Sequence, residues 1–245
     1  MFLMRFFSFF DNMEHKAGFV NIVGNPNVGK STLMNLIMGE RISITTFKAQ
    51  TTRHRIMGIV NSDDCQIVFS DTPGVLKPNY KLQESMLAFS ESALKDADVL
   101  LYVTDVFEKT DKNADFIAEV AALKIPVLVL INKIDVSNQR DLEGLVKSWH
   151  EILPHAEIFP ISAKAKFGVE QVLARIKELL PVCPPYFGKD QWTDKSARFF
   201  VTEIIREKIL LYYDKEIPYS VEVVVEQFKE GEKSIHINAV IYVDR

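Results

Sequence analysis

Residues 24–31 place two glycines, a lysine and a serine at a spacing that suits phosphate binding. They match the pattern G-x-x-x-x-G-K-[ST]. A glycine-rich turn before a helix N-terminus presents backbone N–H groups and a positive dipole to a polyphosphate. In this pattern Lys30 reaches the β- and γ-phosphates and the Ser31 hydroxyl binds Mg²⁺. The predicted phosphate site consists of Gly24, Asn25, Pro26, Asn27, Val28, Gly29, Lys30, Ser31 and Thr32.

A second polar set, Asn132-Lys133-Ile134-Asp135, predicts which base the nucleotide carries. Asp135 can accept hydrogen bonds from both guanine N1–H and N2–H₂, a donor pair that adenine lacks, so ATP is disfavoured. Asn132 would tie this loop to the phosphate loop, and the stem of Lys133 would cover one face of the base. The later tripeptide Ser162, Ala163 and Lys164 fits a third loop, in which the Ala163 N–H meets guanine O6.

Two further segments could complete a magnesium site. Asp71-Thr72-Pro73-Gly74 follows an apolar run, and we expect Asp71 to hold Mg²⁺ through water and the Gly74 N–H to contact the γ-phosphate. Loss of that phosphate would release the segment that follows. Between residues 45 and 55 either Thr51 or Thr52 could add a metal ligand, and we favour Thr52. The predicted metal set is therefore Ser31, Thr52 and Asp71.

Alternating strand and helix patterns must position these loops. The predicted strands are 19–23, 55–60, 66–71, 99–104, 127–131 and 157–161, and helical patterns cover 82–95, 112–123, 140–152 and 169–180. This alternation predicts an α/β fold with a largely parallel six-stranded sheet flanked by helices. The turn at 61–64 predicts one antiparallel edge strand. After the proline-rich stretch 181–185, the patterns predict a helix at 197–212, strands at 220–228 and 234–243, and a turn at 229–232 between them.

The order of these motifs resembles the TRAFAC class of GTPases. Four segments narrow the resemblance to the Era family of bacteria: residues 24–31, Lys48–Arg55, Asp71–Val75 and Glu216–Val221. It covers the chain from about residue 16 to its end. The resemblance implies a P-loop GTPase domain followed by an RNA-binding KH domain of type II. It also implies action in small ribosomal subunit assembly, with the 3′ end of 16S rRNA and the 30S subunit as partners, and a monomer.

The C-terminal region departs from the family pattern. The G-x-x-G loop that clamps RNA in KH modules is absent, and acidic residues slightly outnumber basic ones after residue 181. We expect a truncated KH unit with weak RNA affinity. The predicted boundaries are an extension at 1–16, a GTP-binding domain at 17–180, a linker at 181–195 and a partial KH-like domain at 196–245.

Two residues bear on catalysis. Val75 stands where many GTPases carry a glutamine that orients the attacking water. In related GTPases an asparagine at the position of Asn27 accompanies stimulation by K⁺, so we expect K⁺ held by Asn27 to supply the missing charge. The alternative is that Asn27 only shapes the loop. The predicted catalytic groups are Lys30, Thr52, Gly74 and Asn27, without a general base.

The bulk properties fit an intracellular globular protein. Among 245 residues, 47% are hydrophobic and 25% charged, and the net charge of -4 gives no general attraction to nucleic acid. The two cysteines, Cys65 and Cys183, cannot form a disulfide framework, which favours the cytoplasm. The apolar stretch 1–10 is too short to span a bilayer. We interpret it as an extension before an initiator at Met13, or as a tether peripheral to the inner membrane.

The leading interpretation is therefore a Mg²⁺-dependent GTPase that binds GTP and GDP. Two alternatives stay open. One is a GTP-dependent binding module with negligible turnover, which Val75 favours. The other is a related GTPase that acts on tRNA or the large subunit.

Overall fold

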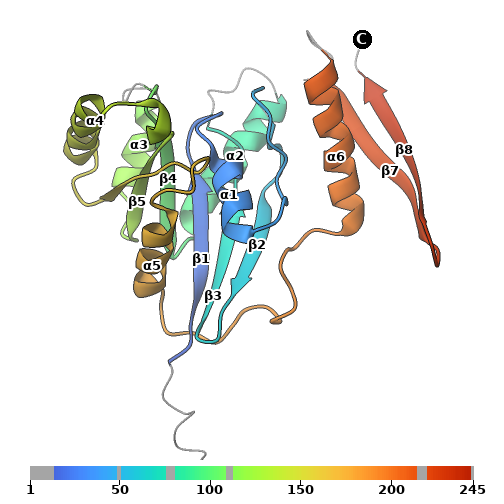
Figure 1. The fold of residues 1–245 in the computed structure, drawn as a ribbon, viewed down its shortest axis with the longest axis horizontal. Helices are drawn as coiled ribbons and strands as arrows, with labels where there is room; N and C mark the ends of the chain where they lie inside the picture. Colours follow the sequence, from blue (N-terminus) through green and yellow to red (C-terminus); the bar gives the residue numbers. More distant parts are fainter. Residues whose placement is uncertain (1–13, 49–50, 76–80, 109–112, 214–219, 244–245) are drawn as a thin grey trace, which may run out of the picture.

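A six-stranded sheet forms the first part of the molecule (Figure 1). The computed structural model of the chain describes residues 14–48, 51–75, 81–108, 113–213 and 220–243. The strands are β1 (Lys16–Val23), β2 (Ile56–Asn61), β3 (Cys65–Asp71), β4 (Val99–Asp105), β5 (Val127–Asn132) and β6 (Glu157–Pro160). Every predicted strand exists, within a few residues of its expected ends.

The strand order β2-β3-β1-β4-β5-β6 puts β1 inside the sheet, between β3 and β4. Both neighbours run parallel to β1, whereas β2 and β3 form the antiparallel edge pair that the turn at 61–64 predicts. β1 is the point at which successive strands change sides: β3 and β2 lie on one side of it, and β4, β5 and β6 lie on the other. In open α/β sheets ligands bind beyond the carboxyl ends of the strands at such a reversal, and the phosphate loop follows β1 directly.

Helices cover both faces of this sheet (Figure 1). On one face α1 (Lys30–Met38) and α5 (Val169–Leu179) pack in one apolar cluster. On the other face α2 (Lys81–Lys95), α3 (Ala114–Ala121) and α4 (Gln139–Ile152) pack in a second cluster. Because β4 and β5 are buried on both faces, they read as nearly continuous apolar runs in the sequence.

The structure corrects several element boundaries. β1 begins at Lys16, so the last residue of the predicted extension 1–16 already belongs to the sheet. The predicted turn at 229–232 is wrong in its first half, since Lys229 and Glu230 pair with His236 and Ile235. A register shift between Val225 and Gln227 lets this pairing continue further than the alternation of side chains suggested.

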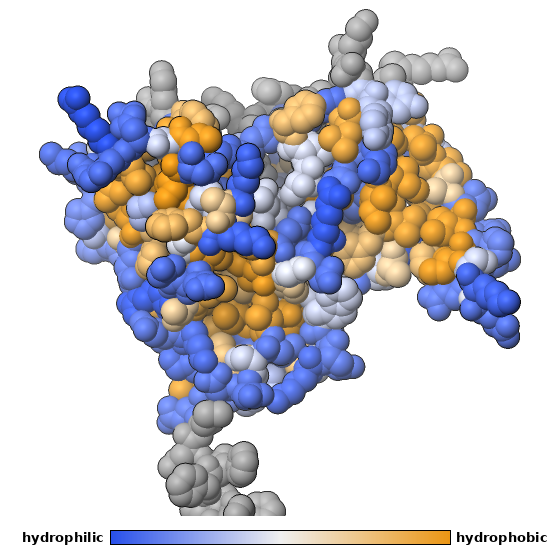
Figure 2. Space-filling view, viewed as in Figure 1, coloured by the Kyte–Doolittle hydropathy of each residue, from blue (hydrophilic) through white to orange (hydrophobic). Residues whose placement is uncertain are grey.

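The C-terminal unit consists of one helix and one hairpin. Helix α6 (Ala197–Tyr212) begins at Ser196, whose hydroxyl accepts the Phe199 N–H, and it packs on β7 (Val221–Glu230). β8 (Ile235–Val243) pairs antiparallel with β7. Apolar side chains of this hairpin remain visible at the surface (Figure 2). The predicted order α-β-β is confirmed.

The predicted linker 181–195 is bonded to the sheet. Gln66 Oε1 accepts the backbone N–H groups of Tyr186 and Phe187, and the Ile59 N–H donates to Trp192 O at 2.9 Å. Cys183 and His15 also exchange hydrogen bonds. The linker thus follows the β2–β3 edge, which covers part of a sheet edge that would otherwise be open.

Within the described ranges, no helix is both long and apolar enough to cross a membrane. Residues 1–13, which carry the predicted tether and Met13, lie outside the described part of the chain.

Candidate nucleotide and metal site

The loop between β1 and α1 has a backbone that only its own residue types allow. Gly24 has φ +141°, and a Cβ there would lie 2.0 Å from Val103 O. Gly29 has φ +102°, and a Cβ there would lie 2.2 Å from Asn132 Nδ2. Asn27 adopts the left-handed region at φ 65°, which asparagine tolerates better than most residues. The loop therefore keeps its shape and its approach to β4 and β5 through these residues.

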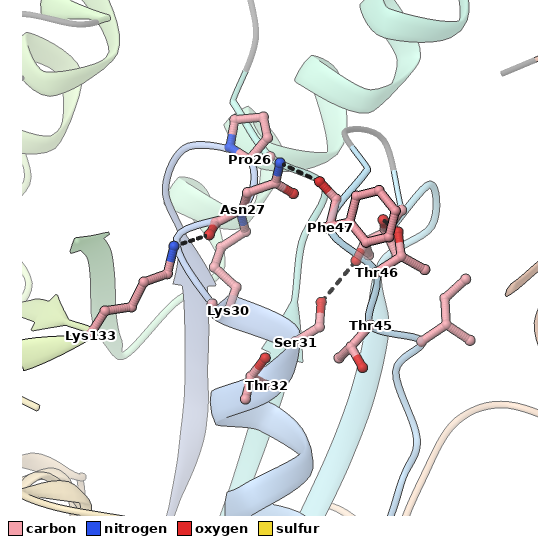
Figure 3. A pocket seen from close by; sticks show the side chains of 14 residues that line it. Pro26, Asn27, Lys30, Ser31, Thr32, Thr45, Thr46, Phe47 and Lys133 are labelled. Atoms are coloured by element: carbon pink, nitrogen blue, oxygen red, sulfur yellow. Dashed lines mark hydrogen bonds between the residues drawn. The ribbon is translucent and has the colours of Figure 1, made fainter. Parts of the chain in front are cut away.

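A cavity of about 280 Å³ opens at this loop (Figure 3). Its walls come from the phosphate loop, from residues 44–47 and 51–52, from Gly74 and from Lys133. The predicted site residues that line it are Pro26, Asn27, Gly29, Lys30, Ser31, Thr32, Thr52, Gly74 and Lys133. The predicted residues that are not part of its lining are Gly24, Asn25, Val28, Asp71, Asn132, Asp135, Ser162, Ala163 and Lys164.

Lys30 points back along its own loop. Its Nζ donates to Gly24 O at 2.9 Å and to Asn25 O at 2.8 Å. Burial lowers the pKa of Lys30 to about 8, although the charges of Asp71 and Glu108 oppose that shift. A buried ammonium that donates to carbonyl oxygens would gain strongly from a nearby anion.

Three side-chain oxygens meet at the base of the cavity. Ser31 Oγ donates to Asp71 Oδ2 at 2.7 Å and lies 2.9 Å from Thr52 Oγ1. Asp71 Oδ1 is buried and makes no hydrogen bond of good geometry among the described residues. Burial raises the pKa of Asp71, against the charge of Lys30 and the nearby hydroxyls. Oxygen donors with one buried, unbonded carboxylate oxygen suit Mg²⁺.

The structure distinguishes the two candidate threonines. Thr51 Oγ1 is bonded to Thr46 Oγ1 and Lys48 O, both at 2.7 Å, so it is held within its own loop. Thr52 is buried and reaches Ser31. Of the two, Thr52 is placed to join the metal set.

The segment after β3 lies against the phosphate loop. A Cβ on Gly74 would lie within 2.8 Å of three Pro26 atoms, so only glycine fits here. Val75 donates its N–H to Gly24 O at 3.0 Å, and its side chain is buried in the apolar cluster on the α2 face. Val75 therefore serves the core, and its side chain is not available to orient a water molecule.

Asn132 connects three loops. Its Nδ2 donates to Val28 O at 2.8 Å in the phosphate loop, and its Oδ1 accepts the Ala163 N–H at 3.0 Å. Asp135 is exposed, and its Oδ1 accepts Ser162 Oγ at 2.6 Å. The Ala163 N–H is predicted to meet guanine O6, but in the structure it already donates to Asn132 Oδ1. A guanine oxygen would have to share it with Asn132.

Lys133 spans the space between the base loop and the phosphate loop (Figure 3). Its backbone has φ 63°, and its Nζ donates to Asn27 O at 2.7 Å and to Asp105 Oδ2 at 2.6 Å. The Asn27 side chain donates to Phe47 O at 3.1 Å, which joins the phosphate loop to residues 44–47.

The structure also assigns residues that sequence reasoning missed. The Asn25 side chain, predicted to bind nucleotide, is 1% exposed and is held by Glu108 and Asn113. Glu108 also accepts Thr104 Oγ1 at 2.9 Å. These partners lie more than eighty positions from Asn25 in the chain, and no local pattern marks them. Asn25 therefore offers only its backbone to a ligand.

Comparison with known proteins identifies the family of this chain. Residues 19–133 match the family described as 50S ribosome-binding GTPase. A structure of Era in complex with MgGDPNP and nucleotides 1506–1542 of 16S ribosomal RNA is 36% identical, with a TM-score of 0.89, covering 94% of this chain and 80% of that one. A point variant of Aquifex aeolicus Era bound to GDP and AlF₄⁻ has the same identity and coverage and a TM-score of 0.88.

A more distant likeness supports the fold alone. The FeoB G-domain of Methanococcus jannaschii is 23% identical, with a TM-score of 0.50, and covers 67% of this chain. The Era matches extend across the GTPase domain and the C-terminal unit together. The chain belongs to the Era family of GTPases.

Proposed function

We propose that this chain binds GTP with Mg²⁺, hydrolyses it to GDP and phosphate, and acts as a switch in the assembly of the small ribosomal subunit. The observation that carries the nucleotide part is one connected site. Ser31, Thr52 and Asp71 meet beside Lys30, and Asn132 joins the phosphate loop to the loop of Ala163. Related structures that hold MgGDPNP or GDP with AlF₄⁻ support it.

In this proposal each residue has a defined role. Lys30 would exchange the carbonyls of Gly24 and Asn25 for the β- and γ-phosphates. Ser31 and Thr52 would hold Mg²⁺ by their side-chain oxygens, and Asp71 would hold it through water. When bound, Mg²⁺ would neutralise phosphate charge as the bond to the γ-phosphate breaks. Gly74 adds a backbone N–H, and Asp135 selects guanine.

Hydrolysis then depends on charge and positioning. No side chain of the described cavity presents itself as a general base, and Val75 is in the core. Phosphoryl transfer needs little covalent chemistry from the protein, so oriented N–H groups and cations can supply most of the rate.

Thr52→Ala is expected to lower kcat for GTP hydrolysis by about tenfold or more, because one side-chain oxygen of the proposed metal set is lost. Thr51→Ala should change it much less, since the Thr51 hydroxyl bonds within its own loop. Single-turnover hydrolysis at saturating Mg²⁺ measures both. Equal losses in the two variants would contradict the assignment of Thr52.

Potassium is expected to raise the hydrolysis rate severalfold over sodium at equal ionic strength, because a cation at Asn27 would stabilise charge in the transition state. The Asn27 amide donates from Nδ2 to Phe47 O, and within the described part of the chain its oxygen remains available to a cation. Asn27→Ala should remove the difference in hydrolysis rate between KCl and NaCl. Equal rates in the two salts for the unchanged chain would refute stimulation by K⁺.

The ribosomal part rests on the similarity to Era bound to 16S rRNA. We infer that its partners are 16S rRNA near the 3′ end and the 30S subunit, which it would contact through residues 196–245, a partial KH-like unit. We also infer that the protein is a monomer, in the cytoplasm or at the inner membrane. Multiple-turnover hydrolysis of GTP tests the proposed enzymatic activity. Gel-shift titration with an oligonucleotide of the 16S 3′ end tests the proposed RNA binding. GTP binding without turnover would favour a pure binding module.

A second candidate is action on the large subunit. The family description 50S ribosome-binding GTPase favours it for residues 19–133. Cosedimentation with separated 30S and 50S subunits in the presence of a non-hydrolysable GTP analogue distinguishes the two, and selective binding to 50S would overturn the small-subunit proposal.

A further inference from the structure

Helix α6 turns a charged face toward the loop that carries Thr52. Glu203, Arg206 and Glu207 are 4%, 3% and 2% exposed. Charged side chains are rarely buried to this degree unless they are paired. In Figure 1 this helix lies beside the β2 edge of the sheet. Arg206 and Glu207 are bonded to residues 41, 45 and 51.

Two of these side chains hold the loop directly. Arg206 Nη2 donates to the backbone oxygen of Thr51. Glu207 Oε1 accepts the Thr45 N–H at 3.3 Å and is also paired with Arg41. The loop of residues 45–51 is therefore bonded to α6 at both of its ends.

Arg206 is itself fixed in place. Glu203, one turn earlier on the helix, accepts Nε at 2.9 Å and Nη2 at 2.5 Å. This fork restricts the guanidinium to one orientation. The remaining terminal nitrogen, Nη1, is buried without a hydrogen bond among the described residues. Apart from Glu203, the acceptor that Arg206 reaches is the Thr51 carbonyl.

That carbonyl is rigidly linked to Thr52. The Thr51 oxygen and the Thr52 nitrogen belong to one planar peptide unit, so fixing the first restricts where the second residue begins. Thr52 Oγ1 lies 2.9 Å from Ser31 Oγ. The chain of contacts Glu203, Arg206, Thr51, Thr52 and Ser31 therefore runs from the C-terminal unit into the predicted metal set.

We propose that Arg206 is a positioning residue that holds Thr52 beside Ser31, so that the C-terminal unit contributes to the GTPase site. The proposal rests on the proposed function, since it takes Thr52 as the metal ligand. Arg206 touches neither nucleotide nor metal, and it acts only through the peptide unit that follows Thr51.

The test must separate positioning from loss of a buried ion pair. Removing Arg206 alone would leave Glu203 buried and unpaired, which is itself destabilising. The test variant is therefore Glu203→Gln combined with Arg206→Met, which removes both charges and keeps similar volumes. The control variant is Lys208→Met, which changes an exposed cation on the same helix.

Two measurements are made on the full chain. In the nucleotide-free protein, hydrogen exchange of a peptide containing residues 51–55 should be faster only in the double variant. In GTP hydrolysis, kcat should fall about tenfold and half-saturation by Mg²⁺ should rise severalfold, while Mg²⁺-free affinity for GDP stays unchanged. Lys208→Met should stay close to the unchanged chain in both measurements.

A folded double variant with unchanged exchange at 51–55 or unchanged kcat would overturn the proposal. Equal losses in Lys208→Met would also overturn it, because they would indicate general loosening of α6. Failure of the unchanged chain to hydrolyse GTP would sink the proposed function instead. The exchange comparison, which uses no nucleotide, would still decide whether Arg206 positions the loop.

Discussion

Asp135→Asn is expected to lower affinity for GTP about a thousandfold, from two hydrogen bonds to a charged acceptor at about 2 kcal/mol each. The same variant should gain affinity for xanthosine triphosphate, because an amide can donate to the xanthine O2 and still accept from N1–H. The structure supports the geometry of this change, since Asp135 is held by Ser162 Oγ at 2.6 Å. Competition binding with GTP, XTP and ATP measures the preference.

The matched control for this prediction is Asp141→Asn on the exposed start of α4, which removes one negative charge away from the base loop. Its nucleotide preference should equal that of the unchanged chain. If Asp135→Asn still prefers GTP, Asp135 does not bind the base. The selection of guanine over adenine would then need another explanation.

Lys30→Met is expected to lower kcat for GTP hydrolysis by at least about a hundredfold, because the cation that would stabilise developing charge on the phosphates is lost. Methionine fills a similar volume and needs no hydrogen bonds, so the nucleotide-free chain should still fold. The fold has little reason to depend on the ammonium, because burial already holds the pKa of Lys30 far below that of a free lysine. Thermal unfolding and single-turnover hydrolysis measure the two effects.

Lys147→Met, on the exposed face of α4, is the control for this lysine. It should leave both hydrolysis and unfolding unchanged. A Lys30→Met chain that is folded and still hydrolyses GTP at the normal rate would contradict the phosphate role of Lys30.

The fold could be predicted from the chain because its signals are local. Alternating apolar runs of strand and helix length specify the α/β order, and each chemical motif follows a strand. Since parallel strands end at one edge of the sheet, residues as far apart as Ser31 and Asp71 were expected to meet. The element ends were less certain, as Lys229 and Glu230 illustrate, because strand pairing decides them.

The sequence by itself determined the chemistry of this protein. Fixed spacings within short segments define the phosphate loop and the polar set ending at Asp135, since neighbouring residues fix their own backbone turns. Tertiary structure alone decided the rest. It brought Thr52 rather than Thr51 next to Ser31, placed Asn25 against Glu108 and Asn113, buried Val75, and set Arg206 on the Thr51 carbonyl. Each of these depends on partners that are distant in the chain, and only packing of the whole molecule brings them within hydrogen-bond distance.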